Sequence, residues 1–376
     1  MSAPPSTHIA WSKVEPARRR FNLADSAIAA PVLASLRLPD HGGLPAVGYE
    51  LLGRLERALG ERLQVPGGMV RVTAGASEAN ACVLGGLLER GDEVLVERPG
   101  YQPHVLAARL FGLTLRHFDR SEATGAGGLE TAVEAARTAA TRMVVLTDLH
   151  NPAGTRLTET DLESLDRLAE RHGFWVFVDE TFRDADRARP VGTAAGRGSR
   201  WVGTSSLTKS YGLGGLRIGW VTGAPEALER CGQVQDALSV VPSLPSVSLA
   251  CDLLPHLDAL RDRTLAILAE NHGRWTEFLE RGAPFTTQEA LGTTAWCRFT
   301  APGDGDAFAV RARREFDLAV TPGRFFGDSS GMRVGLGDEP ERFASSLAAL
   351  ARALQSFRPS SIAGELRAGV STRESA

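Results

Sequence analysis

Short apolar runs rich in β-branched residues alternate with longer amphipathic segments between about residue 50 and residue 245. Runs of this length that are apolar throughout predict strands buried on both faces of a sheet. Strands that alternate with helices are typical of a mainly parallel sheet, because the helices then cover both of its faces. We therefore expect an α/β fold with buried strands at 93–96, 143–146, 175–178, 201–204 and 217–221.

The segment from 158 to 173 predicts one of the covering helices. Thr158 and Asp161 form a capping-box start, and Gly173 is suited to end the helix. We expect its apolar stripe to pack on the sheet, since it has helical spacing. The stripe consists of Leu162, Leu165, Leu168 and Ala169.

The pattern changes after about residue 250, where long helical segments come first, around 260–279. A strand pair near 293–296 and a final helix over about 340–354 predict a smaller α+β domain. The first 35 residues have weak periodicity, which indicates an arm rather than a core element, and the polar C-terminal end predicts a flexible tail. The expected organisation is an arm (1–35), a large domain (36–248), a small C-terminal domain (249–358) and a tail (359–376).

Composition is that of a globular protein, since 43% of the 376 residues are hydrophobic and 23% are charged. The net charge of −3 gives no electrostatic footprint for nucleic acid or for an anionic membrane. No apolar run approaches the ~20 residues that cross a bilayer, and residues 1–7 lack a signal-peptide pattern. We therefore expect a cytoplasmic protein without nucleic-acid or membrane partners.

The four cysteines lie far apart in the sequence and lack the paired spacing of a metal site. We therefore expect buried free thiols in a reducing cytoplasm, and no bound metal. These cysteines are Cys82, Cys231, Cys251 and Cys297.

Lysine is scarce, because only Lys13 and Lys209 stand among the 42 basic residues. Arginine cannot form a Schiff base, so amine chemistry through a side chain would have to use one of these two. Lys209 follows a predicted strand in a segment of hydroxyl residues and glycines that ends at Arg217. Hydroxyls and an arginine suit a phosphate, and a lysine among them suits a carbonyl. The alternative is a solvated lysine in a surface loop.

Three further segments carry polar groups at the ends of predicted strands. Asp179 directly follows a buried strand, where a carboxylate is costly unless it pairs with a ligand or caps a helix. Gly75, Ala76 and Ser77 join a strand to a helix, where free N–H groups can bind an anion or Ser77 can simply cap the helix. The third segment begins with Asn151 and can equally be an ordinary Asn-Pro turn.

Taken together, these segments resemble the fold-type-I pyridoxal-phosphate enzymes, specifically the class I/II aminotransferase family. The resemblance runs from about residue 49 to about residue 349. Its most specific parts are Ser206 three residues before Lys209, the Gly-x-Arg-x-Gly pattern over 215–219, and the order of the motifs. The family implies a seven-stranded-type sheet in the large domain, a smaller C-terminal domain and pyridoxal 5'-phosphate as cofactor.

The resemblance implies cofactor-binding roles for the matched residues. Lys209 would form the aldimine with the cofactor, Asp179 would pair with the pyridine nitrogen, and Asn151 with the ring hydroxyl oxygen. Tyr101 would stack on the ring, although a half-buried tyrosine after a strand is the plainer interpretation. Lys209, Asp179 and Tyr101 would be catalytic. The phosphate would be held by Ser206, Thr208, Arg217 and the turn formed by Gly75, Ala76 and Ser77.

Substrate binding is implied for three residues. Arg333 matches the arginine that clamps the α-carboxylate, because an arginine fork suits a carboxylate, although it could also be a charge at a strand edge. Asn151 would also bind substrate. Tyr49 matches a tyrosine that reaches the phosphate of a neighbouring subunit, so a homodimer with shared active sites is implied. Arg183 is a further candidate for a polar substrate group, against the alternative of a surface residue.

One position departs from the family. The family usually has a tyrosine three residues after the aspartate, and here Phe182 stands there. Without the phenol donor, we expect the cofactor-linked lysine to hold its proton more tightly. Phe182 is also a feature of certain pyridoxal-phosphate arginine oxidases and capreomycidine-type cyclases, so it bears on the reaction type and not on the cofactor.

Three functions follow from these observations. The first is an aminotransferase that acts on an amino acid and an oxo acid. The second is a lyase, cyclase or amino-acid oxidase that uses the same carbanion chemistry on one amino acid. The third is a ligand sensor in a transcription regulator, which is disfavoured because no basic helix-turn-helix pattern precedes residue 49.

Overall fold

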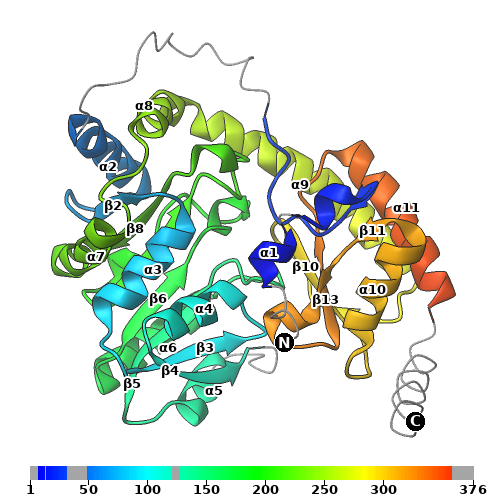
Figure 1. The fold of residues 1–376 in the computed structure, drawn as a ribbon, viewed down its shortest axis with the longest axis horizontal. Helices are drawn as coiled ribbons and strands as arrows, with labels where there is room; N and C mark the ends of the chain where they lie inside the picture. The colour runs from blue at the N-terminus through cyan, green and yellow to red at the C-terminus, as the bar shows by residue number, and fades with distance from the viewer. Residues whose placement is uncertain (1–6, 13, 32–48, 121–127, 358–376) are drawn as a thin grey trace, which may run out of the picture.

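The computed structural model describes residues 7–12, 14–31, 49–120 and 128–357. Lys13 and the expected tail over 359–376 lie outside these residues. The described chain forms a large α/β part and a smaller part with its own sheet, shown side by side in Figure 1. None of the helices within the described ranges is long and apolar enough to cross a membrane.

A seven-stranded sheet forms the centre of the large part, as predicted. All its strands run in the same direction except β8, which is antiparallel to both of its neighbours. The five strands predicted from apolar runs are all present, although β8 begins two residues later than expected, after the turn at Arg217. The order is β2 (Val70–Thr73), β8 (Gly219–Gly223), β7 (Trp201–Ser206), β6 (Trp175–Asp179), β5 (Thr141–Thr147), β3 (Glu93–Arg98) and β4 (Thr114–Asp119).

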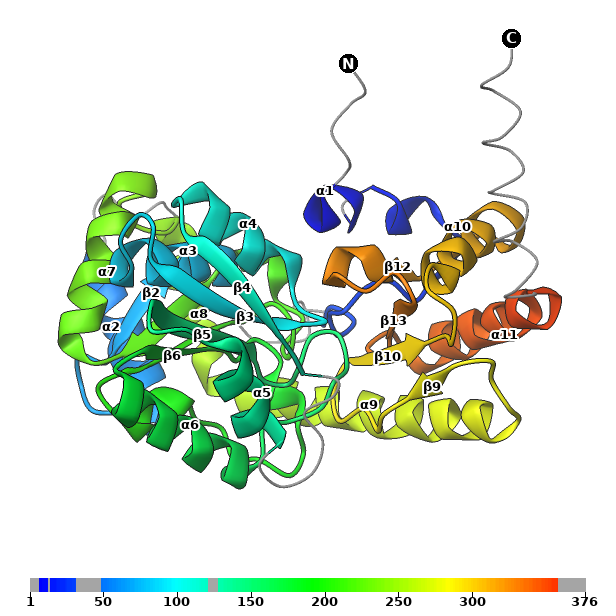
Figure 2. The ribbon, with the colours of Figure 1, turned by 90° about the horizontal axis from the view of Figure 1, so that it is seen from below.

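Both faces of this sheet are buried, which explains why its central strands are apolar without alternation. Val94 and Val96 of β3 belong to the core beneath α3 (Ala76–Leu87), α4 (Gln102–Leu110) and α7 (Pro225–Leu238). Leu95, between them, faces α5 (Gly128–Ala136) and α6 (Glu159–His172) on the other side. Figure 2 shows the sheet between these two layers of helices.

The predicted capping box of α6 is confirmed. The Thr158 side chain accepts a hydrogen bond from the Asp161 backbone, and the Asp161 side chain accepts one from the Thr158 backbone. The helix ends at Gly173, whose φ of 75° is the left-handed conformation that glycine adopts without strain.

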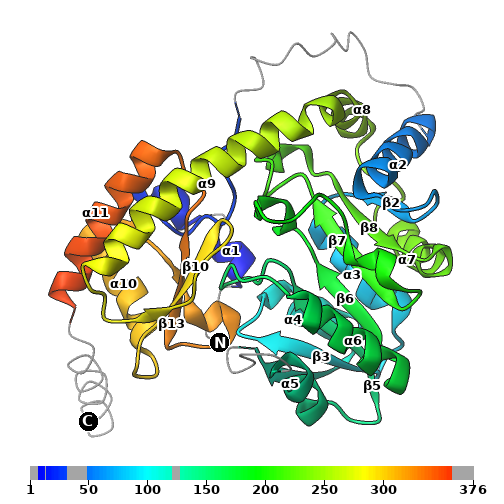
Figure 3. The same ribbon diagram turned by 180° about the vertical axis from the view of Figure 1, so that it is seen from behind.

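Helices at the β2 edge connect the two parts of the molecule. α2 (Tyr49–Leu63) and α8 (Leu244–Leu253) pack together over β2 and β8. From there α9 (Leu257–Glu280) runs along the back of the molecule into the smaller part, as Figure 3 shows.

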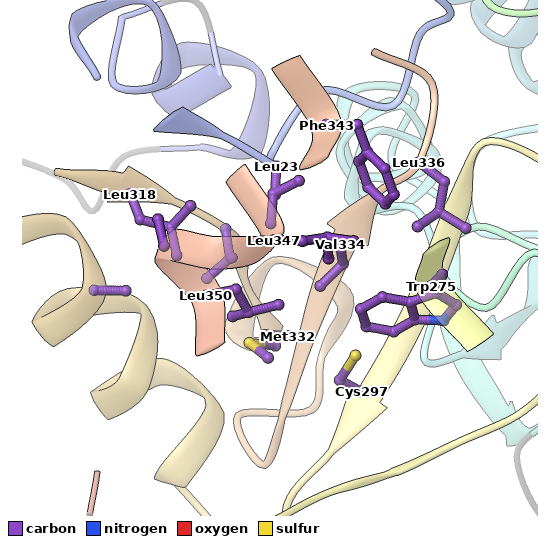
Figure 4. Close-up of a cluster of buried hydrophobic side chains, with 14 of the residues drawn as sticks. Leu23, Trp275, Cys297, Leu318, Met332, Val334, Leu336, Phe343, Leu347 and Leu350 are labelled. Carbon is purple, nitrogen blue, oxygen red and sulfur yellow. The ribbon is translucent and has the colours of Figure 1, made fainter. Parts of the chain in front are cut away.

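The smaller part is built on a four-stranded antiparallel sheet covered by helices. Its order is β12 (Thr321–Pro322), β13 (Gly331–Gly335), β10 (Thr294–Arg298) and β9 (Thr286–Thr287). α10 (Asp304–Phe316) and α11 (Pro340–Ser356) pack on it with α9, and α11 is the predicted final helix. Figure 4 shows Trp275, Met332 and Phe343 in the core between sheet and helices.

The N-terminal segment contributes to this core, so the expectation of an arm without a core element is wrong for residues 21–28. β1 (Phe21–Asn22) pairs in parallel with β11 (Leu318–Ala319), and Leu23 and Ile28 are buried in the small-domain cluster. The short strand gains its partner from a segment almost 300 residues away, so no local periodicity could reveal it. Before it, α1 (His8–Ser12) lies over the junction of the two parts (Figures 1 and 2).

Glu180 is a buried carboxyl group directly after β6, where it accepts hydrogen bonds from Thr193 and from the Ala194 backbone. Burial raises its pKa to about 7, against the opposing influence of Arg183 and these hydrogen bonds. The folded protein therefore binds this proton more tightly than the unfolded chain does. Stability linked to Glu180 is full below the unfolded pKa of 4.5 and falls as the pH rises toward 7.

We predict that Glu180→Gln flattens this pH dependence, because glutamine fills the site without titrating. Between pH 5 and pH 8 the thermal midpoint of the wild-type protein should fall by roughly 2 °C or more relative to the variant. Thermal scans at fixed rate across this pH range measure the difference. Glu163→Gln, at an exposed position of α6, is the matched control and should follow the wild-type curve. Parallel curves for wild type and Glu180→Gln would contradict the prediction.

Candidate active site

A cavity of about 600 Å³ lies at the carboxyl ends of the central strands, where the two parts of the molecule meet. It is lined from both parts and from the N-terminal segment. Most of the residues singled out from the sequence are brought together here, although they are spread over more than 250 positions. These are Ala76, Ser77, Tyr101, Asn151, Asp179, Phe182, Ser206, Thr208, Lys209, Arg217 and Arg333.

Lys209 lies in the cavity wall just beyond β7. Its carbonyl accepts a hydrogen bond from the backbone N–H of Ile28, at 3.1 Å, so the N-terminal segment fixes this turn. Burial lowers the pKa of Lys209, and Arg333 and Arg217 lower it further, while Asp25 acts in the opposite direction. The side chain therefore gives up its proton more readily than a solvated lysine, and the surface-loop alternative is wrong.

Asp179, the last residue of β6, lies between β5 and β7 and is 4% exposed. Its Oδ2 accepts hydrogen bonds from Asn80 at 2.9 Å and from His104 at 3.1 Å. Its Oδ1 accepts from the backbone and hydroxyl of Thr181. Burial alone would raise the pKa of Asp179, but these hydrogen bonds bring it below its ordinary value. The group is therefore an ionised carboxylate next to the cavity.

The helix-cap alternative for Asp179 is wrong, because the next helical turn begins at Arg183 and its N-cap residue is Phe182. The Asp179 carboxylate therefore does not cap a helix.

Asn80, His104 and Thr204 are site residues that the sequence reasoning missed. Thr204 donates a hydrogen bond of 2.7 Å to the amide oxygen of Asn80, which turns the Asn80 N–H₂ group toward Asp179. Asn80 lies one turn beyond Ala76 on α3, and His104 is three residues after Tyr101. Helical spacing of three or four was therefore the available signal, because such residues share a helix face.

The turn at Gly75 leads into Ala76 and Ser77, which line the cavity. Gly75 has a φ of 85°, and a Cβ there would lie 2.4 Å from Nη2 of Arg217. Gly75 is also the N-cap of α3, so the alternative that Ser77 caps this helix is wrong. The free backbone N–H groups of Ala76 and Ser77 remain beside the guanidinium. With the hydroxyls of Ser206 and Thr208 nearby, this donor set fits a phosphate group.

Arg333 faces the cavity from the other side, from β13. The strand lies between β12 and β10, and Arg333 is 1% exposed, so the strand-edge alternative is wrong. Its Nη1 donates to Asn151 at 2.9 Å and its Nη2 to the Ala24 carbonyl at 3.0 Å. Burial lowers its pKa to about 10, which leaves it cationic at neutral pH. A buried guanidinium without an ion-pair partner in the described chain fits a carboxylate ligand.

Two aromatic residues of the cavity differ in what they can offer. Tyr101 is the N-cap residue of α4, and burial together with Asp179 raises the pKa of its phenol to about 12, so it stays neutral. Phe182 is 7% exposed and brings a ring without a donor to the position where the family has a tyrosine.

Two other predicted residues do not line this cavity. Arg183 forms ion pairs with Asp148 at 3.5 Å and Glu180 at 3.8 Å, so the structure does not support its role as a substrate contact. Tyr49 begins α2 and is 64% exposed. Its expected contact is with a neighbouring subunit, so that role stays a prediction.

This chain is similar in sequence and in fold to several known enzymes. Capreomycidine synthase of Streptomyces vinaceus is 29% identical over 315 residues, which cover 82% of this chain and 80% of the relative. A probable N-succinyldiaminopimelate aminotransferase DapC of Mycobacterium tuberculosis is 30% identical over 282 residues, covering 69% and 67% of the two chains. The crystal structure of the PLP-dependent cyclase OrfR superposes with a TM-score of 0.78 at 23% identity, covering 94% of this chain and 98% of that one.

The family described as aminotransferase class I and II matches residues 37–349, which is most of the chain. The cavity agrees with this match, because it combines one half-buried lysine, an ionised aspartate and a phosphate-type donor set. The protein therefore belongs to the aminotransferase class I and II family, whose cofactor is pyridoxal 5'-phosphate.

Proposed function

We propose that the protein is an aminotransferase that moves an amino group between an α-amino acid and an oxo acid. The observation that carries the proposal is the position of Lys209, the one lysine in the described part of the chain, in a cavity shared with Asp179 and Arg333. This cavity joins a titratable amine, a carboxylate for a pyridinium nitrogen and a cation for a substrate carboxylate.

Bound pyridoxal phosphate supplies an electron sink for a carbanion at the substrate Cα. The chain's own residues do the rest. Asp179 offers a carboxylate that hydrogen bonds keep ionised, so it favours the protonated ring nitrogen. Arg333 binds the α-carboxylate, and Asn151 holds the guanidinium in place. Lys209, whose pKa is lowered, would take the proton from Cα and deliver it to the C4′ carbon of the cofactor.

Phe182 favours a second candidate, a cyclase, lyase or amino-acid oxidase of specialised metabolism that uses the same carbanion chemistry. The ring lines the cavity and offers no hydroxyl donor. The similarity to capreomycidine synthase and to the cyclase OrfR supports this candidate, and the similarity to DapC supports transamination.

The two candidates are distinguished by a panel of amino acids added to the yellow holoenzyme without an oxo acid. For an aminotransferase, the reacting amino acid should bleach the cofactor band to a stable amine form, which an oxo acid then reverses. For the second candidate, ammonia, a cyclised product or peroxide should form without any oxo acid.

Lys209→Ala should lower the rate of either reaction by at least about 100-fold, because it removes the group that moves the proton. Circular dichroism and cofactor retention serve as controls for folding of the variant. A variant that still cycles its cofactor at the wild-type rate would show that Lys209 is not the catalytic amine.

Phe182→Tyr should lower the pH at which the spectrum of the bound cofactor titrates, by about one unit. The new hydroxyl would donate to the ring oxygen, and a hydrogen bond to a charged group is worth ~1.5–3 kcal/mol. A spectral pH titration of both holoenzymes measures the shift. Phe182→Leu is the matched control and should keep the wild-type value. A neutral cofactor form that dominates near pH 7 in the wild-type protein would contradict the expectation.

We also propose that the working form is a cytoplasmic homodimer in which Tyr49 reaches the phosphate bound by the neighbouring subunit. The exposure of Tyr49 at the start of α2 supports this arrangement. Sedimentation velocity should give a dimer, and Tyr49→Phe should weaken cofactor binding by about 5-fold, the worth of one hydrogen bond. A monomer that retains full activity would contradict it.

A further inference from the structure

Helix α1 covers the cavity and contacts both parts of the molecule (Figure 2). On the large-domain side, the backbone N–H of His8 donates to the Gln102 side chain at 2.6 Å. On the small-domain side, the Trp11 ring packs on Phe325, with the ring centres 5.6 Å apart. The helix is too short to be stable by itself, so these contacts determine its position.

His8 is one of the residues that line this cavity, and it is 4% exposed. Its ring lies 6.0 Å from Tyr101 and 5.5 Å from both Phe325 and Phe326, measured between ring centres. Neither ring nitrogen has a hydrogen-bond partner among the described residues. A buried polar atom left without a partner is costly, so a group that enters the cavity is the expected partner.

His8 lies toward the carboxylate-binding end of the cavity. Burial, Arg333 and then Lys209 lower its pKa to about 2, so the imidazole is neutral and offers one N–H donor and one acceptor. The larger influence is that of Arg333. Both side chains also contact the Phe326 ring, with the Arg333 guanidinium 5.1 Å from its centre. A carboxylate bound to Arg333 therefore lies in the region that His8 borders.

We propose that His8 binds substrate, donating a hydrogen bond to the carboxylate that Arg333 clamps and thereby holding α1 over the occupied cavity. This inference rests on the proposed function, because it takes the substrate to be an α-amino acid. It makes the N-terminal helix part of substrate recognition and gives the unpaired imidazole a partner only when substrate is present.

His8→Phe tests the proposal, since phenylalanine keeps the aromatic packing and removes both nitrogens. The probes are 2-aminoisobutyrate and isopropylamine, which differ in the carboxylate and lack a side chain to be recognised. Their dissociation constants follow from spectral titration of the holoenzyme. His8→Phe should raise the dissociation constant of 2-aminoisobutyrate by about 10-fold or more and that of isopropylamine by less than about 2-fold. The thermal midpoint of the substrate-free holoenzyme should stay the same or rise, because the variant lacks the unpaired nitrogens.

Three further variants separate binding from packing. His172→Phe changes a histidine that also lies beside a phenylalanine ring but away from the cavity, and it should leave both dissociation constants unchanged. His8→Asn and His8→Gln place an amide N–H near the Nδ1 and Nε2 positions respectively. The variant that restores tighter binding of 2-aminoisobutyrate than of isopropylamine identifies the nitrogen that donates the hydrogen bond.

The outcomes keep this inference separate from the proposed function. Equal losses for both probes in His8→Phe, or a lower thermal midpoint without a loss of discrimination, would show that His8 is a packing residue only. If the wild-type protein binds the two probes equally, or binds neither, the clamp at Arg333 and with it the proposed function is wrong.

Discussion

Asp179 places an ionised carboxylate at the buried end of a central strand, where the charge would cost several kcal/mol without partners. Its donors come from three elements, with Asn80 on α3, His104 on α4 and Thr181 in the turn after β6. Each must stay in place for the charge to persist. The packing of α3 and α4 on the sheet is therefore a condition of the chemistry as well as of the fold.

The cavity is mainly cationic, and this affects stability as well as binding. Among the described lining residues, Lys209, Arg217 and Arg333 carry positive charge, against the buried carboxylate of Asp179 and the exposed carboxylate of Asp25. Of these cations Arg333 is buried and Arg217 is exposed, and a buried cation is unfavourable until an anion reaches it. In the proposed function, a phosphate at Arg217 and a carboxylate at Arg333 would supply the negative charge. Cofactor and substrate that bind the folded protein in this way would stabilise the fold by linkage.

The sequence predicted an element or a site residue correctly where the pattern involved neighbouring residues or a rare residue type. Apolar β-branched runs located the strands because both sheet faces are covered, and a capping box marked α6. Two lysines in the whole chain made Lys209 conspicuous. The partners of Asp179 were not predictable in the same way, because the contact with Asn80 depends on how α3 crosses the strands. The prediction that Arg183 contacts substrate is not supported for a related reason. Its ion-pair partner Asp148 follows the neighbouring strand β5, which is distant in the sequence.

The N-terminal segment shows best why local patterns are insufficient. Its short strand β1 pairs with β11, and the residues that follow contact the guanidinium of Arg333 and the backbone of Lys209. The Ala24 carbonyl accepts a hydrogen bond from Arg333 of the small domain, and the Ile28 N–H donates to the Lys209 carbonyl of the large domain. One extended stretch of five residues thus links Arg333, the proposed carboxylate clamp, to the backbone of Lys209, the proposed catalytic amine. The distance between the two groups depends on this stretch as much as on the sheet, because Arg333 and Lys209 lie on different domains.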